Sequence, residues 1–120
     1  MGVESLHAGM TKEEVLSWFA AKLDRKPTSA DIFSIAKDLY NTGDYARAVR
    51  ALEVYREVPG KGLAGIHLLG YAYYMNGDLL RALETFKSCV NDGFDADWQL
   101  LVEIQLELEA DRGETFDFLA

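Results

Sequence analysis

The chain has 120 residues, which is enough for one domain with a modest core. Its hydrophobic content of 49% is typical of a folded globular chain. The formal net charge of −8 comes entirely from the last quarter, because residues 92–120 contain nine acids and one base. Binding of nucleic acid or of an anionic membrane surface is not expected, since both require a basic patch.

The sequence contains no targeting or membrane segment that we recognise. No apolar run approaches the roughly 18 residues of a transmembrane helix. The first ten residues lack the basic start and apolar stretch of a secretory signal. Residues 1–10 are predicted to be a disordered extension, with Met10 as an alternative native start. Cys89 is the only cysteine, so an intrachain disulfide is excluded and a reducing, cytoplasmic compartment is expected.

The first predicted helix covers residues 11–25. Thr11 followed by Glu14 is a capping-box pattern, in which each side chain satisfies a backbone N–H at the helix start. Pro27 disfavours helical backbone at the residue before it and so ends this helix. A second helix is predicted at 30–42, because apolar residues recur there at helical spacing. Three side chains are candidates for its N-terminal cap: Thr28, Ser29 and Asp31.

Three further helices are predicted at 45–57, 63–75 and 79–91. Asp44 and Asp78 are the expected caps of the first and last of them. A final helix is predicted at 95–110, although its alternating apolar residues on their own suggest a strand. Helix is preferred because the segment exceeds a typical strand and is rich in Leu, Glu and Gln. An acidic and aromatic tail, 111–120, follows.

One short stretch occurs twice in the chain. Gly43-Asp44-Tyr45-Ala46-Arg47-Ala48 is followed 34 positions later by Gly77-Asp78-Leu79-Leu80-Arg81-Ala82. This spacing equals the length of a tetratricopeptide helix–turn–helix unit. The second copy also carries Leu69-Gly70-x-x-Tyr73, then Ala82, Phe86 and Cys89 at the family's spacing. The chain therefore resembles tetratricopeptide repeat proteins, with units at 29–62 and 63–96.

The resemblance implies an all-α fold: a short right-handed superhelix of about six antiparallel helices in a single domain, 11–110. The flanking helices, 11–25 and 95–110, would cover the ends of the two repeats, because each repeat buries its apolar face only against neighbours. The first of them would take the place of a preceding second helix. Ala36, Gly70, Ala48 and Ala82 are small residues on apolar faces and would allow close helix approach. Arg47 and Arg81 are expected to be solvated.

No pattern in the sequence indicates an enzyme, a metal or a cofactor. His7 and His67 are isolated, and none of the common nucleophile, phosphate-loop or zinc motifs occurs. The resemblance instead implies a non-enzymatic protein–protein interaction module, an adaptor or chaperone, with a binding site on its concave face.

The first helix of each unit would line that face. The predicted partner-binding residues are those left over once the packing positions are assigned: Phe33, Lys37, Tyr40, Asn41, His67, Tyr71, Tyr74, Met75, Trp98, Leu101 and Gln105. Exposed aromatic side chains usually mark an interaction site. The alternative is that the chain's own termini bury them. The family's clamp for peptide C-terminal carboxylates uses basic and Asn residues, but Phe33 and Leu68 stand at two of those positions. Recognition of a C-terminal carboxylate is therefore not expected. The predicted partner is therefore a protein or peptide with an apolar segment.

Two other functions are also compatible with the sequence. One is a structural subunit that self-assembles, for instance as a homodimer, through exposed helix faces. The other comes from a weaker resemblance, carried by Tyr40-Asn41-x-Gly43 and the small helical body, to the tetratricopeptide chaperones of bacterial type III secretion. The tail either packs on the body, frays, or docks into a groove of the same or a neighbouring molecule.

Overall fold

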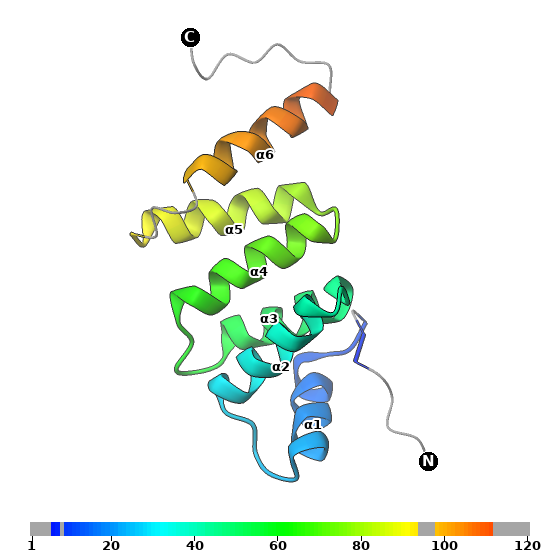
Figure 1. The fold of residues 1–120 in the computed structure, drawn as a ribbon. Coiled ribbons are helices and arrows are strands. Elements are labelled where there is room, and N and C mark those ends of the chain that lie inside the picture. The colour runs from blue at the N-terminus through cyan, green and yellow to red at the C-terminus, as the bar shows by residue number, and fades with distance from the viewer. Residues whose placement is uncertain (1–5, 8, 94–97, 112–120) are drawn as a thin grey trace.

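The computed structural model describes residues 6–7, 9–93 and 98–111, and within this part of the chain it contains six α-helices and no strand. The helices form an elongated stack that measures 56 × 29 × 22 Å (Figure 1). This confirms the predicted all-α fold, and it decides the last segment in favour of helix. The helices are α1 (Lys12–Leu23), α2 (Ser29–Asn41), α3 (Tyr45–Glu57), α4 (Leu63–Met75), α5 (Leu79–Asn91) and α6 (Trp98–Asp111).

From α2 to α6, each helix packs against the next one in the chain, and α2 also contacts α4. α1 departs from the expected arrangement. A preceding second helix would pack mainly on α2, whereas α1 packs chiefly on α3. The structure thus places α1 at one end of the stack and α6 at the opposite end (Figure 1).

The predicted cap of α1 forms, and among the three candidates for α2 the N-cap is Thr28. Thr11 and Glu14 make a reciprocal capping box, and Thr28 makes a second one with Asp31. Arg25 donates two hydrogen bonds to Asp31, at 2.6 and 2.7 Å. These bonds, together with the N–H and hydroxyl of Thr28, hold the pKa of the Asp31 carboxyl well below its usual range. The turn between α1 and α2 is therefore fixed by polar contacts on both sides.

The duplicated stretch forms the same turn twice. Gly43 and Gly77 have φ values of 84° and 85°, a backbone conformation that side-chain-bearing residues rarely adopt. Asp78 caps α5 as predicted. Asp44 occupies the N-cap position of α3 as predicted, but its side chain makes no capping hydrogen bond.

The arginines of the duplicated stretch are exposed, and each is paired as well as solvated. Arg47 donates to Asp44 at 3.2 Å, and Arg81 donates to Asp78 at 3.0 Å. Asp78 accepts from both the side chain and the backbone N–H of Arg81, whereas the Asp44 side chain makes no capping bond, so both copies keep the ion pair and only the second copy keeps the cap.

The apolar core includes residues from the segment before α1. Leu6 is 1% exposed and Met10 is 6% exposed, and both belong to the main cluster of buried side chains. The backbone carbonyl of Met10 also accepts a hydrogen bond from Arg50 Nε at 2.9 Å. The disordered extension predicted for 1–10 is therefore wrong at these two positions, because their apolar side chains find a place in the core.

A polar chain links this N-terminal segment to α3 and α4. Arg50 donates to Glu53 Oε1 at 3.1 Å, and the hydroxyl of the buried Tyr73 donates to Glu53 Oε2 at 2.6 Å. Burial of the phenol, and then its bond to Glu53, raise the pKa of Tyr73. The neutral phenol is the form that can donate this bond, so the folded state favours the protonated tyrosine.

Tyr73→Phe is expected to lower the free energy of unfolding by about 1–2 kcal/mol at neutral pH, since it removes a hydrogen bond to a charged group. The Tyr73 contribution is fully present below the unfolded-state pKa of about 10 and is lost as pH rises through the higher folded-state value. Urea denaturation at neutral and alkaline pH measures both effects. The difference between wild type and variant should shrink above pH of about 10. A constant difference across that range would contradict this role for the phenol.

Candidate functional site

The side of the stack formed by α2, α4 and α6 brings several predicted site residues together. Tyr40 of α2 is half-buried, and its ring lies 5.3 Å from that of Tyr45. Burial raises the pKa of Tyr40, and its neighbours Tyr45 and Tyr71 raise it further. Tyr40 lies on α2 and Tyr71 lies on α4, and these two helices are in contact.

On α4, the aromatic row continues but sits partly in the core. The rings of His67 and Tyr71 lie 4.8 Å apart, and Tyr71 meets the buried Phe86 edge-on at 5.3 Å. His67 and Tyr71 are both half-buried. They therefore offer one edge to the surface and use the other for packing on α5.

Tyr74 connects this row to the last helix. Its hydroxyl donates to Glu107 Oε1 at 3.2 Å, across the space between α4 and α6. Burial, then Glu107 and Glu103, raise the pKa of the Tyr74 phenol. The α6 side of this surface is consequently acidic, whereas Lys37 supplies an exposed positive charge on α2.

The predicted site residues separate into four groups by exposure. Met75 is 47% exposed, and Lys37 and Asn41 are exposed as well. Leu101 is buried, at 7% exposure, because it packs into the core from α6. The side chain of Trp98 lies outside the described part of the structure. The remaining residues are half-buried: Phe33, Tyr40, His67, Tyr71, Tyr74 and Gln105.

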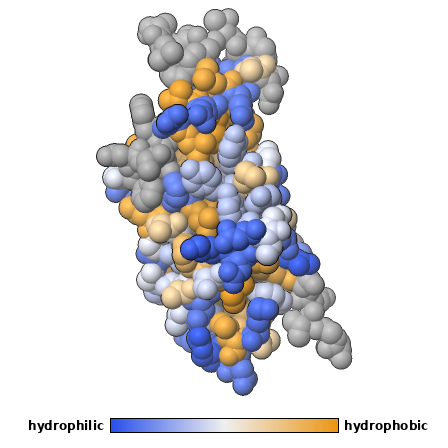
Figure 2. All heavy atoms as spheres, in the orientation of Figure 1, coloured by the Kyte–Doolittle hydropathy of each residue, from blue (hydrophilic) through white to orange (hydrophobic). Residues whose placement is uncertain are grey.

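The space-filling view shows how apolar surface is distributed on one face of the molecule (Figure 2). Apolar side chains gather over α6 at one end, and an apolar strip bordered by hydrophilic residues lies at the α1 end. Leu106 of α6 is 41% exposed, which is high for a leucine. We name the surface of Tyr40, Tyr71, Tyr74 and Met75 the aromatic face.

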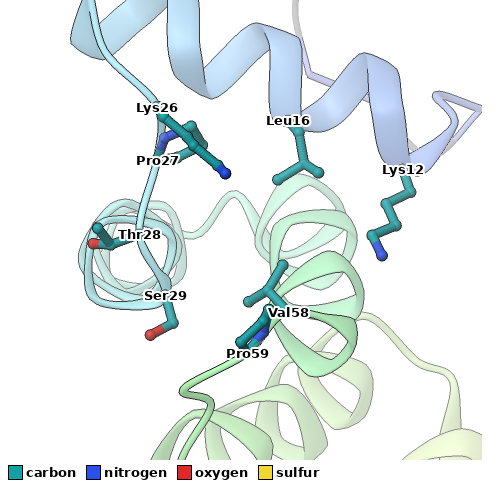
Figure 3. A pocket seen from close by; sticks show the side chains of 8 residues that line it. All are labelled: Lys12, Leu16, Lys26, Pro27, Thr28, Ser29, Val58 and Pro59. Atoms are coloured by element: carbon teal, nitrogen blue, oxygen red, sulfur yellow. The ribbon is translucent and has the colours of Figure 1, made fainter.

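A separate cleft of about 450 Å³ lies between α1, the start of α2 and the end of α3. Leu16 and Val58 point toward one another across it, Lys26 reaches in from the turn before α2, and Lys12 lies on the opposite side (Figure 3). Pro27 and Pro59 complete the apolar wall. The cleft thus combines an apolar interior with two lysine side chains.

This cleft was not predictable from the sequence. Pro27 and Pro59 signalled the ends of helices, and nothing in their spacing indicated that the two turns meet. The cleft arises because α1 packs on α3 and leaves room beside the first residues of α2. Glu107, the partner of Tyr74, was also missed, because its contact joins helices that are not consecutive in the chain.

In the described part of the chain, no helix combines the length and the apolar character that a membrane crossing demands. Likewise, no cluster of three or more His, Cys, Asp and Glu side chains among the described residues is arranged to hold a metal ion.

The stacked helix pairs, the repeated glycine turn and the small residues at helix contacts define a helical-repeat protein. Residues 29–55 match the family model described as tetratricopeptide repeat, so the chain contains a repeat of this family. No curated protein and no solved structure matches the chain. Nothing in these comparisons supports the resemblance to type III secretion chaperones.

Proposed function

We propose that this chain is a non-enzymatic interaction module that binds an apolar peptide segment or amphipathic helix on its aromatic face. A tetratricopeptide repeat points to protein partners, and the aromatic face supports the proposed mode of binding. The observation that carries the proposal is the row of partly buried aromatic side chains on α4, His67, Tyr71 and Tyr74, which reaches α6 through the hydrogen bond from Tyr74 to Glu107. Tyrosines of this kind give large contact area with few rotors to immobilise.

The partner's chemistry follows from what surrounds these rings. The half-buried aromatic edges and the exposed Met75 favour apolar side chains. Glu103 and Glu107, which flank Tyr74, favour a partner with a basic residue beside its apolar stripe. An amphipathic helix with a basic edge combines both features. The single cysteine is compatible with action in a reducing compartment such as the cytoplasm.

The test is a binding screen with a panel of synthetic peptides, some amphipathic and some uniformly polar, measured by fluorescence anisotropy. The double variant Tyr74→Ala, Met75→Ala is expected to weaken the tightest binder at least about tenfold. Its thermal stability should fall only slightly, because Met75 is exposed and Tyr74 is only partly buried.

The matched control is Leu80→Ala, which truncates a side chain that is 59% exposed on α5 and lies outside the aromatic face. Peptide affinity should be unchanged in this variant. Binding that is equally strong in the Tyr74, Met75 double variant would show that the peptides dock elsewhere. A panel without any binder would also contradict the proposal.

A further inference from the structure

The cleft between α1, α2 and α3 has the chemistry of a site for a segment that is both apolar and acidic. Its interior is formed by Leu16, Pro27 and Val58, and Lys12 and Lys26 stand beside it. Among the described residues, neither lysine makes an ion pair. The volume of about 450 Å³ falls in the usual range of ligand sites. An apolar side chain can therefore fill the cleft while a neighbouring carboxylate meets a lysine.

The charge of the chain is divided along the stack. Residues 6–62, which include α1, α2 and α3, contain nine bases and eight acids. Residues 63–111, which include α4, α5 and α6, contain two bases and nine acids. The α1 half of the elongated molecule is therefore close to neutral, whereas the α6 half is strongly negative. Such a distribution favours contact between the α1 end of one copy and the α6 end of another.

The sequence that follows α6 matches the cleft in chemistry. Residues 114–119 are Glu-Thr-Phe-Asp-Phe-Leu, in which carboxylates alternate with aromatic and apolar residues. Their structure is outside the described residues, but they follow Asp111 at the end of the stack opposite α1 (Figure 1). Between α6 and the cleft lie α5, α4 and part of α3, each adding roughly 8–10 Å. Phe116 and Phe118 stand five and seven residues after Asp111 and so extend about 18 and 25 Å from it at most, which places the cleft of a second copy within easier reach than the chain's own.

We propose that the cleft lined by Lys12, Leu16, Lys26 and Val58 binds residues 114–119 of a second copy of this chain. Phe116 and Phe118 supply the side chains that enter the apolar interior, and Glu114 and Asp117 pair with the two lysines. The contact is head-to-tail, so each bound pair leaves one cleft and one tail unoccupied. Assemblies therefore lengthen as concentration rises, and they shorten in salt because the lysine pairs are screened.

Two measurements on the full chain test this proposal. Sedimentation should show a mass that increases with concentration and falls at high salt. A labelled synthetic peptide of residues 112–120 should bind the full chain at low protein concentration. Lys12→Glu with Lys26→Glu should weaken peptide binding about tenfold or more, which corresponds to about 1.4 kcal/mol. Lys87→Glu, an exposed charge reversal on α5, serves as the control and should change the affinity little.

A charge-swapped peptide with Glu114→Lys and Asp117→Lys should recover affinity for the double lysine variant, which separates direct pairing from a folding defect. Circular dichroism checks that the variant is folded. A monomer at every concentration that also fails to bind the peptide would overturn the proposal. Self-association that survives the lysine reversals would also overturn it. Peptide binding that appears only after deletion of residues 112–120 would overturn it as well, because it would indicate that the tail docks within its own molecule.

Discussion

Phe86→Ala is expected to lower the free energy of unfolding by about 3–5 kcal/mol, the cost typical of truncating a fully buried aromatic residue. Phe86 is 0% exposed and contacts the rings of His67 and Tyr71 on α4. It also fills the space above Gly70, where a Cβ atom would lie 2.6 Å from the Phe86 ring. Neither the new alanine nor the backbone at Gly70 can fill the void. The expected loss of stability therefore includes both the buried phenyl ring and the cost of the remaining cavity.

Urea denaturation followed by far-UV circular dichroism measures this loss. A domain of this size has about 5–15 kcal/mol of stability, so the variant should show a clearly lower midpoint. The control is Leu80→Ala on the same helix, which truncates a side chain that is 59% exposed and should change stability by less than about 0.5 kcal/mol. A loss below about 1 kcal/mol for Phe86→Ala would mean that the α4–α5 contact can collapse around the void.

The helices were predictable because their signals are local. Gly43 and Gly77 each end a helix in a left-handed turn, and the apolar residues between them recur at helical spacing. The closeness of α4 and α5 was also predictable, since Gly70 is small on an otherwise apolar face and lies directly against Phe86. Even the last helix, whose alternating pattern imitates a strand, followed from its length and composition.

The places where prediction failed all depend on which distant elements meet. Leu6 and Met10 have no periodic neighbours, so nothing local indicates that they enter the core. Leu101 was expected at the surface, but the packing of α6 on α5 buries it. Asp44 and Asp78 occupy identical positions in the duplicated stretch, yet only one of them caps its helix. Such differences arise from side-chain geometry that spacing alone does not determine.

The candidate site was predictable only in its outline. The repeat phase predicted the helices on which these residues lie, with Tyr40 on α2 and Tyr71 and Tyr74 on α4. It did not indicate that the Tyr71 ring contacts Phe86 edge-on, nor that the Tyr74 hydroxyl donates a hydrogen bond to Glu107. If the proposed function holds, these contacts aid binding by fixing the orientation of the rings, because a fixed ring loses less entropy when a partner binds.

Gly65→Ala is expected to lower the free energy of unfolding by about 1–3 kcal/mol, although alanine normally stabilises a helix relative to glycine. A Cβ atom at this position would overlap the ring of the buried Tyr55. That ring has little room to move away. Its oxygen accepts a hydrogen bond from the Gly62 N–H at 2.6 Å, and its ring centroid lies 5.9 Å from that of Phe33. The steric cost therefore exceeds the helix-propensity gain of about 1 kcal/mol.

Two variants isolate this contact in the same denaturation experiment. Ala64→Gly, at an exposed neighbouring position of α4, measures the propensity difference alone and should cost about 1 kcal/mol. Tyr55→Leu removes the ring that Cβ would meet, at a stability cost of its own. If the overlap with Tyr55 is the cause, Gly65→Ala added to Tyr55→Leu should be neutral or stabilising, giving a coupling energy of at least about 1 kcal/mol. An additive double variant would instead show that Gly65 is required for a reason other than the α3–α4 contact.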